Sequence, residues 1–403
     1  MVSKLKINFN DLNFARLYYF AFMGGWGFIL PFLNLFYVSL GFSGKQIGFI
    51  ASTSAIVGML ISPVWVSEVK KHPKARRILQ AALIFGALGY FSIGLQKFFP
   101  FVILVVFLHS LAASGIMPLS DSMAVTVSQE QGSGYGSVRV WASLGWIVSL
   151  LSSGWLVARF GYIAGFVGVC VMWLIASGLL FFIKPKYFSS HHDIDQPKSN
   201  VLMAVRLISQ DKVLMGFAIA LVAIGFLNNG VLQFENVFLA ELGASKQLIS
   251  VAGILSAVVE LPFMIFSDRI VRRVGAHRLM ITAMFLTMLQ RLTALIWPFI
   301  PVIMVVRFIG GVAFSFYTIA FIGLISSHTQ SAQRGTVLAL YSVTIAGLVN
   351  IIAAPISGAI FDLIGARWLY ALSAAGYLIG VTCLWWTKPN FFQNSQMQDE
   401  RSS

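Results

Sequence analysis

The chain has 403 residues, of which 58% are hydrophobic and only 10% are charged, and its mean hydropathy is +0.83. Soluble domains are about half apolar and about one quarter charged, so this composition excludes an ordinary soluble protein and indicates a chain that lies mostly in lipid. The formal net charge of +14 is compatible with a nucleic-acid partner or with a membrane protein, and the positions of the charges decide between the two.

Apolar runs of about 20 residues, the length that a bilayer core requires, recur along the whole chain and are separated by short polar breaks. Helices are expected there because each helix satisfies its own backbone hydrogen bonds in lipid. The first run is too long for a signal peptide and lacks a small-residue cleavage site, so we expect it to be retained. The predicted spans are residues 14–40, 46–67, 77–96, 100–127, 137–158, 162–183, 213–240, 247–267, 277–297, 301–326, 335–361 and 368–387.

Basic residues concentrate in alternate loops of this twelve-span map. Roughly 20 of the 28 Lys and Arg residues fall on one side, at the N-terminus and in segments 70–77, 184–212 and 269–278. The positive-inside rule makes that side the cytoplasm, so we expect a multi-pass protein of the cell inner membrane with both termini cytoplasmic and no nucleic-acid partner. The opposite loops carry only a few bases, namely Lys45, Lys97, Arg159, Lys246 and Arg367.

The cysteine and histidine pattern predicts neither a disulfide framework nor a metal site. Cys170 and Cys383 both lie in apolar runs. The tandem His191 and His192 lie in a polar segment without further metal-ligand residues, which favours a solvated linker over a metal site. We expect no cofactor.

The polar segment divides the chain into two halves with a weak internal repeat at an offset of roughly 200 residues. Gly41 and its Phe-Ser-Gly-Lys-Gln-Ile continuation pair with Gly243 and its Ala-Ser-Lys-Gln-Leu continuation, and Pro63 pairs with Pro262. This pattern predicts an all-α membrane protein with two six-helix bundles related by pseudo-two-fold symmetry and a central substrate site. The expected divisions are residues 1–184, a cytoplasmic linker 185–212, residues 213–390 and a tail 391–403.

Two segments of the first half carry a family resemblance. The chain reads Pro118-Leu-Ser-Asp121 and then Tyr135-Gly-Ser-Val-Arg139-Val-Trp-Ala-Ser. This resembles the lactose-permease-like branch of the major facilitator superfamily, and most closely its 3-phenylpropionate permease group. Glu260 after Val258-Val and Arg291 after Gln290 resemble segments of the same group. The resemblance implies the major facilitator fold, and an aromatic or other carboxylic acid as substrate, with sugars or nucleosides as the next classes.

The superfamily also carries an acidic and basic loop motif after its second and eighth helices. Asp268 can hold a basic partner at the cytoplasmic gate, although the bases that follow it also fit ordinary positive-inside anchoring. The resembling families have a tenth-helix histidine where this chain has Gly310, so their proton relay is not transferred. The residues expected in gating are Asp268, Arg269, Arg272, Arg273 and Arg307.

Six charged residues fall within the predicted spans, where an unpaired charge costs roughly 2.5 to 3.5 kcal/mol. Glu260, near the middle of its helix and followed by Pro262, is the first candidate for the protonated group. Low dielectric favours the neutral form of the Glu260 carboxyl, whereas a nearby Arg291 favours its charged form. Movement of Arg291 would therefore make Glu260 bind or release a proton. A permanent structural ion pair is the alternative. Candidates for proton coupling are Glu260, Arg291, Asp121 and Glu235.

The remaining intramembrane charges allow two roles each. Asp121 and Arg139 would be within reach of each other if their helices are antiparallel neighbours, and they fit cytoplasmic closure as well as contact with substrate. Glu235 and Arg307 fit a periplasmic gate. The polar residues that would line a substrate cavity, each also explicable by helix packing, are Arg139, Asn34, Asn228, Asn229, Trp26, Tyr317 and Tyr341.

These patterns together predict a secondary active transporter, with proton-coupled symport of a small organic solute by alternating access. We expect a monomer whose partners are the solute, protons and the lipid bilayer. A proton-driven exporter of small amphipathic compounds and a non-transporting membrane receptor are the alternatives. An enzyme is not expected because no catalytic motif of the common hydrolase, zinc protease or phosphate-binding types is present.

Overall fold

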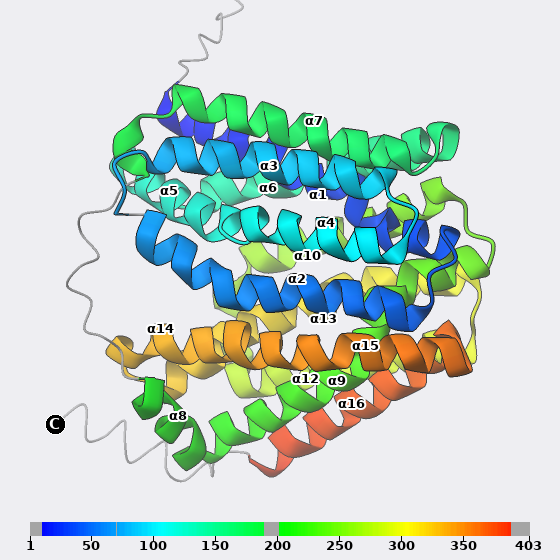
Figure 1. Cartoon of the computed structure of the whole chain (residues 1–403). Helices are drawn as coiled ribbons and strands as arrows, with labels where there is room; N and C mark the ends of the chain where they lie inside the picture. The colour runs from blue at the N-terminus through cyan, green and yellow to red at the C-terminus, as the bar shows by residue number, and fades with distance from the viewer. Residues whose placement is uncertain (1–9, 70, 189–200, 388–403) are drawn as a thin grey trace, which may run out of the picture. The chain divides into compact units, whose positions relative to one another are not determined.

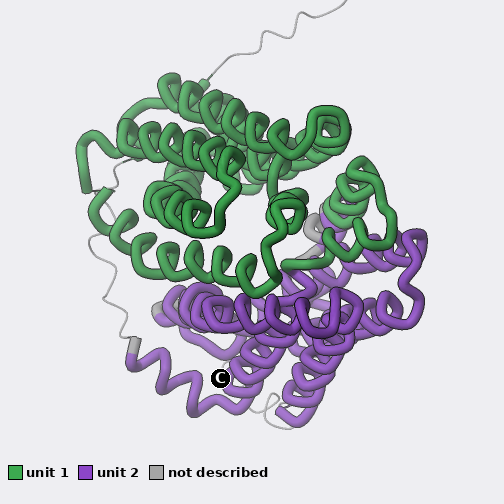
Figure 2. Tube along the Cα trace, turned by 45° about the vertical axis from the view of Figure 1, so that its right-hand side comes forward, with its two compact units in different colours: residues 1–195, 233–257 green, residues 196–232, 258–403 purple. Residues whose placement is uncertain are grey.

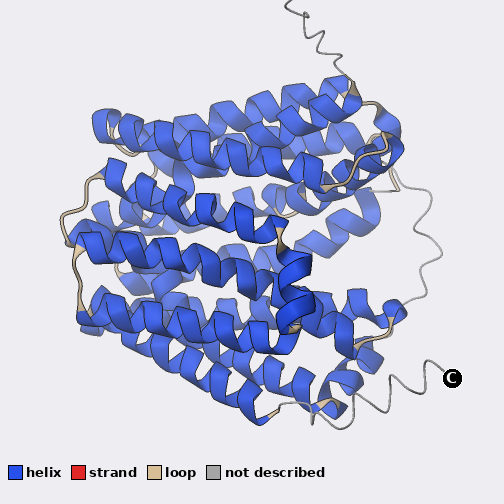
Figure 3. Ribbon diagram, turned by 180° about the vertical axis from the view of Figure 1, so that it is seen from behind, coloured by secondary structure: helices blue, strands red, loops and turns tan. Residues whose placement is uncertain are grey.

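The computed structural model describes residues 10–69, 71–188 and 201–387, and these residues form helices and connecting turns without a strand (Figures 1 and 3). The first helices are α1 (Asp11–Ser39), α2 (Gly44–Val64) with the π-helical turn η1 (Trp65–Val69), α3 (Ala75–Leu95), α4 (Phe99–Ala113), α5 (Ile116–Glu130), α6 (Gly136–Phe160) and α7 (Ile163–Leu179). They are followed by α8 (Val201–Gln210), α9 (Lys212–Glu241), α10 (Lys246–Ile265), α11 (Ser267–Val274), α12 (Ala276–Ile296), α13 (Ile300–His328), α14 (Ser331–Ala339) with the π-helical turn η5 (Leu340–Ile345), α15 (Ala346–Ile364) and α16 (Ala366–Trp386).

Within the described residues, eleven helical segments are long and apolar enough to cross a membrane. They coincide with eleven of the predicted spans, and α10 occupies the place of the remaining one. The prediction of an all-α membrane protein is confirmed.

Local sequence signals set several helix boundaries. Ser43 and Gln46 form a capping box at the start of α2, in which each side chain bonds the other residue's backbone N–H. Gly41 before α2 and Gly243 before α10 have φ values of +79° and +88°, a region that favours glycine. The repeat pair found in the sequence therefore forms the same kind of turn twice.

The predicted span 100–127 is broken in the structure between α4 and α5. A Cβ atom on Gly115 would overlap the indole ring of Trp65, and that indole donates a 2.9 Å hydrogen bond to the carbonyl of Leu111. The chain breaks its helix here because the Trp65 ring of η1 occupies the space beside Gly115. The predicted span itself is confirmed, because Phe99–Glu130 is one apolar segment long enough to cross a membrane, and the interruption lies within it.

The segment predicted as a linker contains a helix that the sequence analysis missed. Ala204 and Ile208 of α8 are buried in a core cluster with Leu279, Leu324 and Tyr341. The apolar residues of α8 recur at helical spacing, a signal that the polar residues preceding them in the same segment obscure.

The described helices group into two compact units (Figure 2). Unit 1 comprises residues 1–195 and 233–257, and unit 2 comprises residues 196–232 and 258–403. The C-terminal part of α9 and the first part of α10 thus pack with the N-terminal helices.

Unit 1 is held together by close backbone approaches around α1. A Cβ atom on Gly145 of α6 would overlap the carbonyl oxygen of Phe20, so only glycine permits this approach. The buried Trp173 of α7 donates to the carbonyl of Phe22 over 3.1 Å. These contacts place α1 against both α6 and α7.

Candidate functional site

The carboxylate of Asp121 on α5 is held by two tyrosines of unit 1. The hydroxyl groups of Tyr19 on α1 and Tyr135 donate to Oδ1 of Asp121 over 2.6 Å and 2.7 Å. No ion pair joins Asp121 to Arg139, whose side chain is exposed, among the described residues. The two charges thus form no ion pair in the described residues, and Tyr135, four residues before Arg139, bonds the carboxylate instead; their roles in closure or substrate contact stay predictions.

Trp26 belongs to an aromatic cluster inside unit 1. Its ring lies 5.0 Å from that of Phe22 and 6.1 Å from that of Trp173, centroid to centroid. The role of Trp26 in substrate binding stays a prediction, and the structure gives this residue a packing role.

Asn34 takes part in a reciprocal contact between α1 and the C-terminal part of α9, both in unit 1. The Asn34 amide donates to the carbonyl of Gln233 over 2.7 Å, and the Asn236 amide donates to the carbonyl of Pro31 over 3.0 Å. Each asparagine thus bonds the residue three positions before the other asparagine. We call these two hydrogen bonds the amide clasp.

The neighbouring part of α10 packs in the same unit. A Cβ atom on Gly154 of α6 would lie 2.7 Å from Oγ of Ser250, so the two helices approach closely. Lys246 donates to the carbonyl of Val157 over 3.4 Å, and its ammonium lies 4.5 Å from the ring centroid of Tyr162. Lys246 is one of the few bases predicted on the outer side, and its ammonium contacts Val157 and Tyr162 of unit 1. Glu235 lies on the same part of α9, next to Asn236.

Two lysines after α7 tie that end of unit 1 together. Lys184 forms a 3.3 Å ion pair with the buried carboxylate of Asp11, and Lys186 pairs with Glu130. The hydrogen bond to Glu130 raises the pKa of Lys186. Both lysines belong to the basic segment that the sequence assigned to the cytoplasmic side.

In unit 2, the predicted coupling residues lie on α10 and α12. Arg291 is only 7% exposed, and its guanidinium lies 5.8 Å from the ring centroid of Tyr370. The carbonyl of Glu260 accepts a 3.2 Å hydrogen bond from Ser315 of α13. Glu260 thus contacts α13 through its backbone, and α13 packs against α12, the helix that carries Arg291.

Gly310 of α13, where the resembling families have histidine, faces a glutamine. A Cβ atom on Gly310 would lie 2.5 Å from Nε2 of Gln290, so the Gln290 amide fills the space that a side chain at 310 would need. Arg307, one turn earlier on α13, is buried.

Four predicted cavity residues of unit 2 are engaged in helix packing. Asn228 accepts from the Ser373 hydroxyl over 2.7 Å, and the Asn229 amide donates to Oδ1 of Asn350 over 2.7 Å. The Tyr341 hydroxyl donates to the carbonyl of Leu214, and Tyr317 stacks with Phe321. Their role in binding substrate stays a prediction.

The predicted gating motif lies at α11. The side chain of Asp268 is outside the described residues. Arg272 and Arg273 are exposed, and the guanidinium of Arg269 lies 5.9 Å from the ring centroid of Phe266. The gating role of this segment stays a prediction.

No group of three His, Cys, Asp or Glu residues that could hold a metal ion occurs in the described part of the chain. His191 and His192 lie outside it.

Several residues of these contacts were missed by sequence reasoning. Tyr19 and Tyr135 carry no local sign of their contact with Asp121, since Tyr19 lies 102 residues from it. Asn236 did carry a signal, because it follows Asn34 by 202 residues, the same spacing that separates Gly41 from Gly243.

Comparison with known proteins agrees with this architecture. The model of the MFS_1 like family matches residues 12–372. The maltose permease of Geobacillus stearothermophilus is 30% identical over 271 residues, which are 66% of this chain and 66% of the permease. The uncharacterized transporter YwbF of Bacillus subtilis is 25% identical over 371 residues, 89% of this chain and 90% of that protein.

The predicted branch is also found among the relatives. A probable 3-phenylpropionic acid transporter of Escherichia coli is 25% identical over 153 residues, 37% of this chain and 40% of that protein. Among solved structures, the nucleoside transporter NupG has a TM-score of 0.78 at 16% identity, over 94% of this chain and 99% of its own, which shows the shared fold. The relatives are transporters and not enzymes, and the chain belongs to the MFS_1 like family of membrane transporters.

Proposed function

We propose that the chain is a secondary active transporter that couples the movement of protons to symport of a small organic solute by alternating access. Glu260 carries the proton in this proposal, and Arg291 controls its release. Asp121 and Glu235 are the alternative proton sites.

The observation that carries the proposal is the burial of Arg291 on α12, a helix that packs against α13, whose Ser315 bonds the backbone of Glu260. A cation and a carboxyl within membrane-spanning segments are costly, and such groups commonly serve proton and ion pathways. Motion of the arginine relative to the carboxyl would change which protonation state of Glu260 is favoured.

The amide clasp supplies the outer gate in this proposal. Alternating access requires a contact that forms and breaks in each cycle, and two neutral hydrogen bonds between helices contribute only about 1 kcal/mol each. We assign Asn34 and Asn236 to this gate, and the gating roles of Glu235 and Arg307 stay predictions. In the same proposal the segments around Lys184 and Arg272 face the cytoplasm of a cell whose inner membrane holds the protein.

The test is a measurement of proton flux into proteoliposomes when aromatic acids, sugars or nucleosides are added one at a time. Wild type is compared with Glu260→Gln, which keeps the shape of the side chain and removes its proton exchange. We expect a solute-triggered proton flux in wild type and its loss in Glu260→Gln. Glu130→Gln is the matched control, because Glu130 is an exposed carboxylate paired with Lys186, and its flux should stay at the wild-type level.

Flux that survives in Glu260→Gln would move the proton site to Asp121 or Glu235. Solute uptake without any proton movement would refute symport and leave a uniporter.

A further inference from the structure

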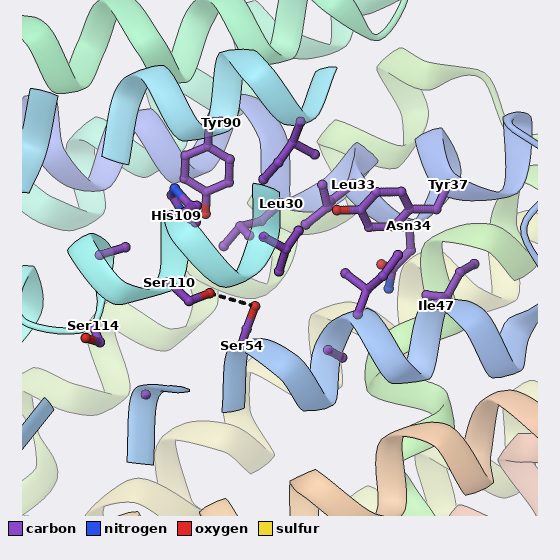
Figure 4. Close-up of a pocket in the computed structure, with 16 residues that line it drawn as sticks. Leu30, Leu33, Asn34, Tyr37, Ile47, Ser54, Tyr90, His109, Ser110 and Ser114 are labelled. Carbon is purple, nitrogen blue, oxygen red and sulfur yellow. Dashed lines mark hydrogen bonds between the residues drawn. The ribbon is translucent and has the colours of Figure 1, made fainter. Parts of the chain in front are cut away.

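A cavity of about 390 Å³ lies inside unit 1 among α1, α2, α3 and α4 (Figure 4). This volume falls in the range of small-molecule sites, roughly 300 to 1,000 Å³. Its walls are mainly apolar, with Leu30, Ile47, Ile93 and Val106 among them. None of the described residues that line it is Asp, Glu, Lys or Arg.

The cavity contains a buried hydroxyl group that bonds nothing. Tyr37 is only 1% exposed, and its hydroxyl has no hydrogen-bond partner among the described residues. In Figure 4 the hydroxyl points toward the middle of the lining side chains. The Tyr37 hydroxyl is therefore available to a ligand or to water in the cavity.

Two serines add a second donor on the opposite wall. The Ser110 hydroxyl donates to Oγ of Ser54 over 3.1 Å (Figure 4). Because a hydroxyl carries one proton, Ser110 has used its proton in this bond and Ser54 keeps its own for another acceptor. Tyr37 and Ser54 are thus donors that the cavity offers, and Tyr90 brings a third hydroxyl to its lining.

The acceptors come from Asn34 and His109. Asn34 uses its amide nitrogen on the carbonyl of Gln233, which leaves Oδ1 available to accept. Nδ1 of His109 lies 3.0 Å from the carbonyl of Gly86, and because a carbonyl only accepts, Nδ1 carries the proton. In the neutral ring Nε2 is then an acceptor.

Neutral donors and neutral acceptors on a mainly apolar wall match a particular kind of molecule. Hydroxyl groups both donate and accept, so an uncharged molecule with several hydroxyls can satisfy these groups. An ionised carboxylate would instead lie in the cavity without a cation to pair with, and burial of an unpaired charge is strongly unfavourable.

We propose that this cavity binds an uncharged, hydroxyl-bearing solute, and that such solutes, rather than carboxylic acids, are the substrate class. The second clause rests on the transport function proposed above. Asn34 connects the site with the gate, because the same side chain borders the cavity and forms one half of the amide clasp.

The test is equilibrium binding to the purified full chain in detergent, with maltose, uridine and 3-phenylpropionate as probes. We expect maltose or uridine to bind and 3-phenylpropionate not to bind. Tyr37→Phe should weaken that binding about threefold to tenfold, since it removes one hydrogen bond to the ligand and none within the protein. Ser54→Ala should act in the same direction.

Tyr18→Phe is the matched control. It deletes a buried hydroxyl that bonds Ser120 outside the cavity, so binding should keep its wild-type affinity. Thermal unfolding of each variant shows whether it has kept its fold.

The outcomes separate the site from the transport proposal. Binding of 3-phenylpropionate alone, no binding of either uncharged probe, or equal effects of Tyr37→Phe and Tyr18→Phe would each overturn the assignment, whatever the proteoliposomes transport. Tyr37-dependent binding of an uncharged probe that is never transported would support the site and refute the transport function.

Discussion

At the scale of single residues, Asp121 illustrates how a membrane protein can hold a carboxylate without a cation. Its Oδ1 accepts from two tyrosine hydroxyls, one from the buried Tyr19 and one from the half-buried Tyr135. Hydrogen bonds to a charged group are stronger than those between neutral groups, so two of them partly replace an ion pair.

We predict that Tyr19→Phe destabilises the protein more than Tyr135→Phe. Tyr19 is fully buried, so its loss leaves the carboxylate short of a donor that water cannot easily replace, at a cost of about 2 kcal/mol. At the half-buried Tyr135 the cost should be nearer to about 1 kcal/mol, because water can enter. Denaturant unfolding in detergent micelles measures both differences.

Arg139→Gln is the comparison that isolates the expected ion pair. Since Arg139 is exposed and forms no ion pair with Asp121, this change should alter stability by less than either tyrosine variant. A larger loss in Arg139→Gln than in Tyr19→Phe would mean that the arginine, and not the tyrosines, stabilises the carboxylate.

At the scale of helices, the amide clasp reflects the internal repeat. Pro31 and Gln233, like Asn34 and Asn236, are separated by 202 residues, the spacing of the repeated turn glycines Gly41 and Gly243. When equivalent segments contact each other across a two-fold relation, the contact is reciprocal, because each segment makes the same hydrogen bond to the other. A duplicated sequence can thus supply both halves of such a contact from one original asparagine.

We predict that Asn236→Ala loosens the outer part of α9 and the start of α10. The variant removes the donor to the Pro31 carbonyl, so residues 233–257 should open more often and exchange their amide protons faster. Hydrogen–deuterium exchange of the detergent-purified protein measures this. Asn350→Ala, which removes an interhelical contact of unit 2, serves as the control and should leave exchange in 233–257 unchanged.

Unchanged exchange of residues 233–257 in Asn236→Ala would show that the packing of Ser250 against Gly154 is sufficient without the clasp. The outer gate would then have to be sought in Glu235 and Arg307.

At the scale of the whole molecule, the distribution of charge predicts which side of the membrane each loop faces. The two ends of α3 provide a direct comparison, since exposed Lys74 precedes the helix and exposed Lys97 follows it. The positive-inside rule assigns Lys74 to the cytoplasm and Lys97 to the opposite side.

We predict that Lys97→Cys reacts with a membrane-impermeant maleimide in intact cells, whereas Lys74→Cys reacts only after the membrane is opened. The background is the Cys170→Ser, Cys383→Ser variant, which removes the two native thiols. The reverse pattern would invert the topology, and labelling of both positions in intact cells would contradict a membrane-spanning α3.

The class of protein, the positions of its apolar helices, its expected sidedness and its family could all be predicted from the amino-acid sequence. Lipid imposes these features locally, because every span needs a run of about 20 apolar residues and every loop carries its own charges. Such signals are complete within one segment of chain and need no knowledge of its neighbours.

The pairing of side chains, in contrast, became known only from the folded chain. The break at Gly115 depends on Trp65, the carboxylate of Asp121 depends on Tyr19, and the cavity depends on side chains from four helices. Spacing along the chain shows which face of a helix a residue occupies but not which other helix lies against that face, because the packing of distant helices sets that choice.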